Sequence, residues 1–282
     1  MTTTTSAPPP LTAPHPRRRR RRPGKGRGLQ IYTIALVGWL LLPIAVMILF
    51  GFNDTHTKQN FEWEGFTLKW YVHLFDKKDL TTALINSITI ALLTTVIATA
   101  LGTLLGLAIG RHRFRGQGLA NVVMFAAISC PEIVMGASLL SMFVASETPR
   151  GYLTILAAHV MFSVSFVAIT VRARAVGIDP SVEEAARDLG AGPLATFRLV
   201  TLPMLMPGVL SGALLAFALS VDDFIITNFT SGATQTFPLW VWSSTRTGTP
   251  PQVNVMGTLI FAVGVLLAVV NIAAARRRAR RT

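Results

Sequence analysis

The chain has 282 residues, of which 51% are hydrophobic and only 14% are charged, and its mean hydropathy is +0.52. Because a water-soluble domain of this length carries more charge, the composition excludes a soluble globular protein and indicates an integral membrane protein. The formal net charge of +13 is compatible with nucleic-acid binding, but an arginine run such as residues 17–22 is weak support for that function by itself.

Six windows of the sequence are long and apolar enough to cross a bilayer, since a helical span needs about 20 apolar residues. They lie near residues 30–51, 83–110, 119–145, 151–172, 203–222 and 254–275. We therefore expect an all-α membrane protein with one transmembrane domain over residues 29–275, between basic tails at 1–28 and 276–282. The first window is too long for a removable signal peptide and lacks a small-residue cleavage site.

The lysines and arginines predict the topology of these spans. Of the 26 basic residues, 20 fall in four places: the N-terminal tail, the 111–116 turn, the 172–200 segment and the C-terminal tail. This asymmetry follows the positive-inside rule, so we expect both termini and the 172–200 segment to be cytoplasmic, with an even number of spans. The N-terminal tail is expected to be disordered near anionic lipid rather than to bind nucleic acid.

Small residues and a proline mark the packing of the spans. Gly102, Gly106 and Gly110 lie four residues apart on one helical face, which favours close packing against another helix of the same chain over a subunit interface. Pro131 is expected to kink or break the third span next to Glu132.

Cysteine and histidine usage excludes two kinds of site. The lone cysteine, Cys130, cannot form an intrachain disulfide, and the five histidines form no cluster with metal-ligand spacing, so no metal site is expected. His159, inside the fourth span, is predicted to be a packing or hydrogen-bonding residue rather than a proton relay.

A polar segment at residues 179–202, which we call the elbow, lies between the fourth and fifth spans. Asp179 and Pro180 predict a helix start, Gly190 predicts its end, and a second helix is expected to begin at Gly192–Pro193. So short a helix is marginal in water and needs a surface to pack on. Because the elbow continues into both neighbouring spans, a force applied to it would be transmitted to them.

Three interpretations of the elbow are open from spacing alone. It is an amphipathic connector at the membrane surface, a helix-turn-helix that reads DNA, or a docking element for a cytoplasmic partner. The flanking spans prevent docking into a major groove, which disfavours the second.

Acidic residues within apolar segments predict the substrate pathway. A carboxylate costs about 2.5–3.5 kcal/mol in a bilayer, so Glu132, Asp222 and Asp223 are expected to face a cavity or a partner. The alternative for the aspartate pair is a cap on an exposed helix end, and for Glu132 it is a protonated or hydrated carboxyl near the interface. In the broken apolar segment that follows, Trp240 and Trp242 are candidates for cation–π contact with an alkylammonium, although interfacial anchoring is the commoner role of tryptophan.

The stretch EEAARDLGAGPLATFRLVTLP at 183–203 resembles the EAA motif of ABC-importer permeases. The matching positions are Glu184, Ala185, Ala186, Gly190, Leu202 and Pro203. Four further stretches are similar to the C-type permease of spermidine/putrescine importers: FTLKWY at 66–71, RHRFRG at 111–116, PEIVMG at 131–136 and SVDDFIITNF at 220–229. The resemblance covers roughly residues 30–272.

This resemblance implies the type I importer fold, with six transmembrane helices and a cytoplasmic coupling helix between spans four and five. It implies two ATPase subunits, a second permease subunit of the B type, an external substrate-binding protein and a polyamine substrate. The residues it implicates in ATPase coupling are Glu183, Glu184, Ala185, Ala186, Arg187, Asp188, Gly190, Leu202 and Pro203. The chain has no GxxxxGK[ST] motif, so it is expected to be a non-catalytic subunit without a cofactor, in the inner membrane among lipids, with ATP bound by the partner.

Other functions remain open at this point. An ion-coupled secondary transporter would use the acidic residues as ion sites, but such folds show internal repeats, and no convincing repeat is present. An ABC permease for a different small solute and a membrane scaffold without transport activity are the remaining alternatives.

Overall fold

The structure is a computed structural model that describes residues 26–57 and 60–279. Most of the predicted N-terminal tail, residues 1–25, and the end of the C-terminal tail, residues 280–282, lie outside the described residues. The chain divides into two compact units, residues 1–46 and 47–282, and each is described by itself. The first unit contains most of one long apolar helix, Gly26–Phe50.

Secondary structure in the described residues is helical apart from a single β-bridge between Asn53 and Phe66. The helices are α1 (Gly26–Phe50), α2 (Lys69–Val72), α3 (Lys78–Arg111), α4 (Gln117–Ser129), α5 (Glu132–Ala145), α6 (Tyr152–Val176), α7 (Ser181–Asp188), α8 (Pro193–Thr196), α9 (Leu202–Asp222), α10 (Ile225–Thr230), α11 (Phe237–Ser244) and α12 (Pro251–Ala279). A π-helical turn, Phe197–Thr201, joins α8 to α9 without a break. The terminal helices α1 and α12 extend into the segments expected to be tails, to Gly26 and Ala279.

The candidate membrane spans agree with the windows predicted from the sequence, with one difference. Five helical segments among the described residues are long and apolar enough to cross a membrane, and α4 with α5 makes a sixth if the pair counts as one span. The two helices are bent by 106° at their break. Pro131 sits at that break as predicted, because proline lacks the N–H that an α-helix needs and clashes with the preceding turn. The third window is therefore a bent pair of helices and not a straight span.

The core of the second unit is the packing of α3 on α6 and α9. Buried alanines and branched residues fill it, among them Ala98, Val167, Val171 and Leu205. A Cβ added at Gly102 would lie 2.6 Å from the Cβ of Val167. The prediction that the glycine face packs within the chain is confirmed, because only a residue without a side chain lets α3 approach α6 so closely.

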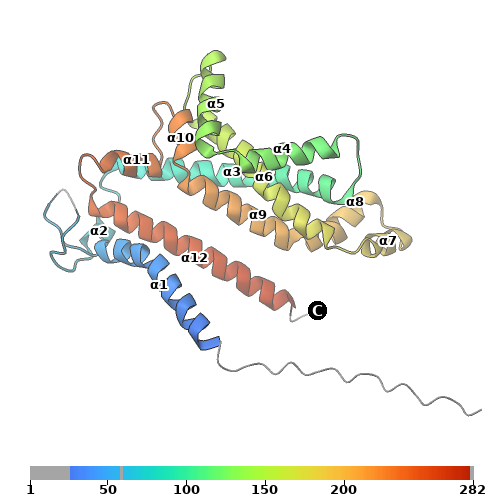
Figure 1. Cartoon of the computed structure of the whole chain (residues 1–282), viewed down its shortest axis with the longest axis horizontal. Coiled ribbons are helices and arrows are strands. Elements are labelled where there is room, and N and C mark those ends of the chain that lie inside the picture. The colour runs from blue at the N-terminus through green and yellow to red at the C-terminus, as the bar shows by residue number, and fades with distance from the viewer. Residues whose placement is uncertain (1–25, 58–59, 280–282) are drawn as a thin grey trace, which may run out of the picture. The chain divides into compact units, whose positions relative to one another are not determined.

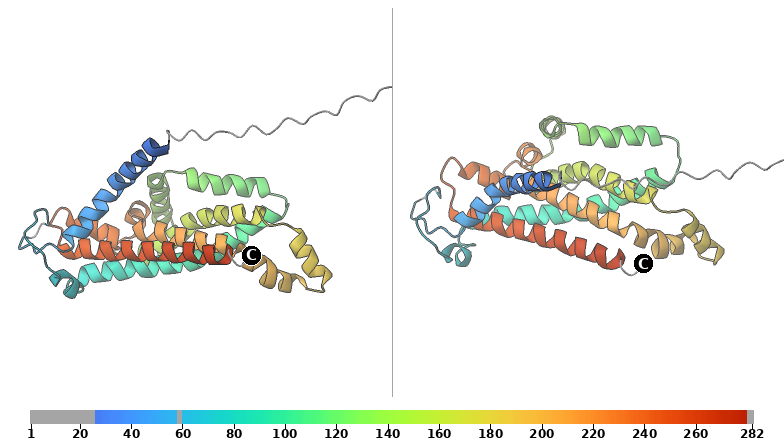
Figure 2. Two further views of the ribbon diagram at one scale, coloured as in Figure 1. Left: turned by 90° about the horizontal axis from the view of Figure 1, so that it is seen from below. Right: turned by 60° about the horizontal axis from the view of Figure 1, so that its bottom comes forward.

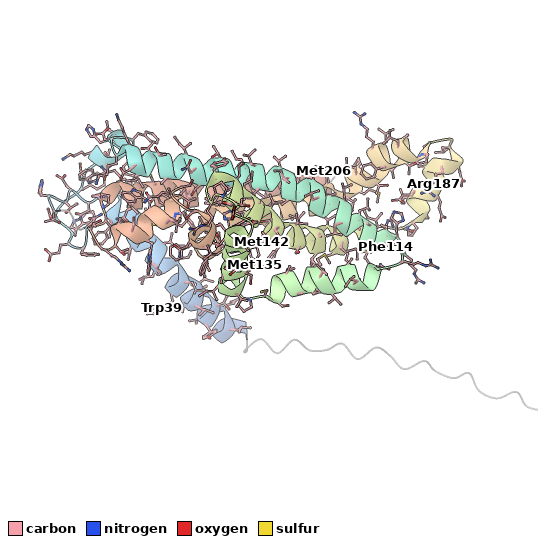
Figure 3. The ribbon with its side chains drawn as sticks, turned by 90° about the horizontal axis from the view of Figure 1, so that it is seen from above. Trp39, Phe114, Met135, Met142, Arg187 and Met206 are labelled. Carbon is pink, nitrogen blue, oxygen red and sulfur yellow. The ribbon has the colours of Figure 1, made fainter. Side chains whose placement is uncertain are left out.

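Within the second unit, two groups of short segments lie at opposite ends of the long helices. Figure 1 shows α7 and α8 at one end and α2 and α11 at the other. The α7–α8 pair extends beyond the neighbouring helices (Figure 2). Arg187 on α7 and Phe114 in the turn after α3 lie at the same end (Figure 3). The basic 111–116 turn and the elbow thus lie on one side, as the charge distribution predicted.

Candidate coupling elbow and substrate pathway

The elbow helix α7 begins at Ser181, with Pro180 and not Asp179 at the N-cap, and it ends just before Gly190 as predicted. Asp179 Oδ1 accepts a hydrogen bond of 2.9 Å from the backbone N–H of Ser181, and this bond lowers the pKa of the Asp179 carboxyl. At the other end Gly190 has a φ of +87°. Its N–H donates to the Arg187 carbonyl at 2.9 Å, and the N–H of Ala191 donates to the Ala186 carbonyl at 3.0 Å. This pair of bonds is a Schellman motif, in which glycine tolerates the left-handed conformation.

Among the described residues, the Glu183 carboxylate makes the side-chain hydrogen bonds that link α7 to other helices. Arg111, the last residue of α3, donates to Glu183 Oε1 at 2.6 Å and to the Ile178 carbonyl at 2.8 Å. The Thr201 hydroxyl donates to the same Glu183 oxygen at 2.8 Å. Burial raises the pKa of Glu183, but the bonds from Arg111 and Thr201 and the charges of Arg111 and Arg187 outweigh it, so its pKa lies below the ordinary value.

These contacts add a third attachment to the elbow. The sequence connects it to α6 and α9, and the Arg111–Glu183 pair connects it to α3 as well. Arg111 was not among the predicted coupling residues, because only its place in RHRFRG marked it and its partner lies 72 residues away.

Most of the other side chains of α7 are exposed to solvent. Glu184, Ala185, Arg187 and Asp188 are exposed, whereas Ala186 is half-buried. Leu189, after the last turn of α7, is 90% exposed. Leu194 and Leu199 in the same elbow are also exposed, at 77% and 72%, and exposed apolar residues rimmed by charged ones are typical of a surface that a partner covers. Leu202 and Pro203 belong instead to the first turn of α9, which continues directly from the π-helical turn.

The two adjacent aspartates at the end of α9 have different environments. Asp223 is 5% exposed in its side chain, and its Oδ2 lies 3.1 Å from His159 Nε2. The same oxygen accepts 2.8 Å and 2.7 Å hydrogen bonds from the backbone N–H and the hydroxyl of Thr227 in α10. His159 Nδ1 is 2.7 Å from the Ser220 hydroxyl. His159 is thus a buried hydrogen-bonding residue, as predicted, and Asp223 joins the end of α9 to α6 and α10.

Asp222 is exposed and lines a cavity of about 500 Å³, which we call the Asp222 cavity. Trp242 and Phe224 share its wall, with ring centroids 5.3 Å apart, and Phe237 and Phe261 complete the aromatic lining. No basic side chain lines it among the described residues. Glu132, in the first turn of α5, is half-buried and lies close enough to interact with the charges of both aspartates. The predicted acidic residues therefore gather in one region.

The second predicted tryptophan lies on the other side of α11. Trp240 is 8% exposed, and its Nε1 donates to Asp79 Oδ2 at 2.9 Å. It borders a separate cavity of about 550 Å³ that also contains Asp79, which we call the Asp79 cavity. Because residues two apart on a helix face nearly opposite directions, Trp240 and Trp242 line different cavities.

Comparison with known proteins gives relatives over most of the chain. Residues 102–281, more than half of it, match the family described as the binding-protein-dependent transport system inner membrane component. The chain is 34% identical over 241 residues to the spermidine/putrescine transport system permease protein PotC of Haemophilus influenzae, with 85% of this chain and 93% of that protein covered. It is 38% identical over 245 residues to the putrescine transport system permease protein PotI of Escherichia coli, with 83% and 86% covered.

Solved structures with the same fold are more distant in sequence. A bacterial ABC transporter that imports the acidic polysaccharide alginate aligns with a TM-score of 0.62 at 17% identity, over 90% of this chain and 99% of that one. An amino acid ABC transporter aligns with a TM-score of 0.56 at 16% identity, over 75% and 99%. The described helices therefore have the fold of type I ABC-importer permeases.

Proposed function

Since the chain belongs to the family of binding-protein-dependent transport inner membrane components, and is the non-catalytic permease subunit of an ABC importer, we propose that it carries polyamines such as putrescine or spermidine across the inner membrane. Family membership contradicts the ion-coupled secondary transporter and the scaffold that the sequence left open. The names of the PotC and PotI relatives support a polyamine as the cargo.

The observation that carries this proposal is the chemistry of the Asp222 cavity. One carboxylate faces aromatic rings without a basic side chain among the described lining residues. An alkylammonium fits such a site, because its charge pairs with the carboxylate and its face-on contact with Trp242 is a cation–π interaction. Apolar lining residues such as Val221 and Ile260 suit the methylene chain between two amines. Glu132 adds negative charge nearby, while Asp223 holds α10 in place and so positions Asp222.

In this proposal the exposed face of the elbow docks on a cytoplasmic ATPase subunit. Glu184, Ala185, Arg187, Asp188 and Gly190 form the contact, and Glu183 faces inward to transmit the displacement. Since the elbow is attached to α3, α6 and α9, closure of two ATPases would move these three helices as one body and switch the cavity between inward-facing and outward-facing states.

The proposed assembly also follows the family. The chain pairs with a second permease subunit of the B type and receives its cargo from an external binding protein, with both termini in the cytoplasm. The transmembrane domain takes residues 29–275, and the basic tails lie near anionic lipid.

The test is uptake of labelled putrescine by proteoliposomes that contain this chain, the second permease and the ATPase, with the binding protein outside. We expect uptake to require ATP. Asp222→Asn should lower uptake efficiency about 10- to 100-fold, since a hydrogen bond to a charged group contributes about 1.5–3 kcal/mol, while stimulated ATP hydrolysis is largely kept.

Asp76→Asn is the matched control, because Asp76 is an exposed aspartate outside this cavity. Equal losses of uptake and ATP hydrolysis in Asp222→Asn would contradict a role in the pathway. Uptake driven by an ion gradient without the ATPase would contradict the importer mechanism.

A further inference from the structure

We propose that the Asp79 cavity is a second, outer binding site for an alkylammonium group, from which the cation passes to the Asp222 cavity. This inference rests on the proposed function only for the identity of the cation. Its own basis is the geometry around α11, which separates the two cavities. Figure 1 shows α11 beside the beginning of α12, at the end opposite α7.

The first observation is a buried acceptor without a donor. Gln252, in the first turn of α12, lines the Asp79 cavity and is 5% exposed. Its Oε1 has no hydrogen-bond partner among the described residues. Buried acceptors are nearly always satisfied, because they have lost their hydrogen bonds to water. This oxygen is itself covered from solvent, so a donor in the cavity would satisfy it once the Gln252 amide turns toward the cavity.

The second observation is the remaining lining, which suits a ligand with donors only. Asp79 Oδ2 accepts the Trp240 indole N–H, and an ionised carboxylate has about four lone-pair sites, so acceptor capacity remains. Trp70 also lines the cavity, and its Nε1 donates to the Asn53 carbonyl at 2.7 Å, which fixes the orientation of the ring. An ammonium group has three donors and no acceptor, and it interacts favourably with aromatic faces.

The third observation is a lysine that competes for the same carboxylate, so the cation is bound only briefly. Lys77 lines the same cavity, and its positive charge acts on Asp79. Among the described lining residues, the charges of Lys77 and Asp79 therefore offset each other. An incoming ammonium must compete with Lys77 for the Asp79 carboxylate. The Asp222 cavity has a carboxylate and no such competitor among its described lining residues. We therefore expect the Asp79 cavity to hold the cation less tightly than the Asp222 cavity does.

The experiment measures equilibrium binding of labelled putrescine, and of butylammonium as a probe with one charge, to the assembled transporter in nanodiscs without nucleotide or binding protein. All variants carry Asp222→Asn, so that the Asp222 cavity does not contribute. Lys77→Met should tighten binding about tenfold, because it removes the competing cation. Asp79→Asn should weaken binding about tenfold, while its amide oxygen still accepts the Trp240 N–H.

Lys78→Met is the matched control, because Lys78 is the adjacent exposed lysine and does not line the cavity; it should leave binding unchanged. If Asp79→Asn fails to assemble, the opposite response of Lys77→Met still tests the site. Unchanged binding in Lys77→Met, or equal tightening in Lys78→Met, would overturn the outer site.

The two proposals fail in distinguishable ways. If the wild-type chain does not support polyamine uptake but butylammonium binding still responds to Lys77→Met, the outer ammonium site stands and the proposed cargo is wrong. If Asp222→Asn abolishes polyamine uptake while neither residue of the Asp79 cavity affects binding, only the outer site is wrong.

Discussion

Glu183 in the elbow and Asp223 at the end of α9 are both partly or wholly buried carboxylates, yet they hold their surroundings in different ways. Glu183 accepts hydrogen bonds from the Arg111 guanidinium and the Thr201 hydroxyl. The rest of α7 is held by its own caps, and most of its side chains are exposed. Asp223 and its partner His159 are almost fully buried and join three helices. The docking surface proposed for α7 needs few internal contacts, whereas a segment beside a cavity within the membrane needs all its polar groups satisfied internally.

The largest effect is expected where the buried pair is broken. His159→Leu leaves the buried Asp223 carboxylate without its hydrogen bond to His159 Nε2, which should lower the free energy of unfolding by about 3 kcal/mol, because an unsatisfied charged group costs more than a neutral one. Thermal unfolding of the purified transporter measures the change. His159→Gln is the control, because its amide can still donate to Asp223, and it should retain most of the stability. Equal loss in both variants would show that ring packing matters more than the hydrogen bond.

A smaller effect is expected at the elbow anchor. Arg111→Ala removes the donor to Glu183 and to the Ile178 carbonyl, and should lower the stability by about 1–3 kcal/mol. Because α3 is then detached from the elbow, ATP hydrolysis should be less strongly coupled to uptake. The measurement is the ratio of transported substrate to hydrolysed ATP. Arg113→Ala, in the exposed part of the same turn, should leave that ratio unchanged.

The pH dependence of the elbow follows from the lowered pKa of Glu183. A carboxyl whose pKa is lower in the folded than in the unfolded chain stabilises the fold above its ordinary pKa of 4.5, and this contribution is lost as the pH falls through the folded value. Wild-type stability should therefore fall more steeply than that of Glu183→Gln as the pH falls below the ordinary pKa of 4.5. Parallel curves would contradict the assigned hydrogen bonds.

The smallest effect on stability is expected on the exposed face of α7. Glu184→Lys changes an exposed charge without a salt-bridge partner among the described residues, so stability should change by less than about 0.5 kcal/mol. Co-purification with the ATPase should nevertheless be lost, because the substitution replaces a negative charge on the proposed docking surface with a positive one. Retained co-purification would indicate that α7 is only a connector at the membrane surface.

Features that depend on neighbouring residues were predictable from the sequence. The start of α7 just after Asp179, its end just before Gly190 and the break at Pro131 each follow from the chemistry of a few adjacent backbone groups. The glycine face of α3 was predictable because a helix repeats its faces at fixed spacing. The lengths of the apolar segments predicted where the spans lie. The distribution of basic residues predicted that the elbow and the 111–116 turn lie on the same side.

The pairings that build the sites were not predictable in the same way. Trp240 and Asp79 are 161 residues apart, and His159 and Asp223 are 64 apart. The adjacent aspartates look equivalent in the sequence, yet one is buried against His159 while the other faces a cavity, because the helix ends between them. By itself the sequence determined a helical permease with a capped elbow, since caps, proline breaks and hydrophobic length are local properties. Only the tertiary structure decided which carboxylates are satisfied and which stay free, because that depends on contacts between helices far apart in the chain.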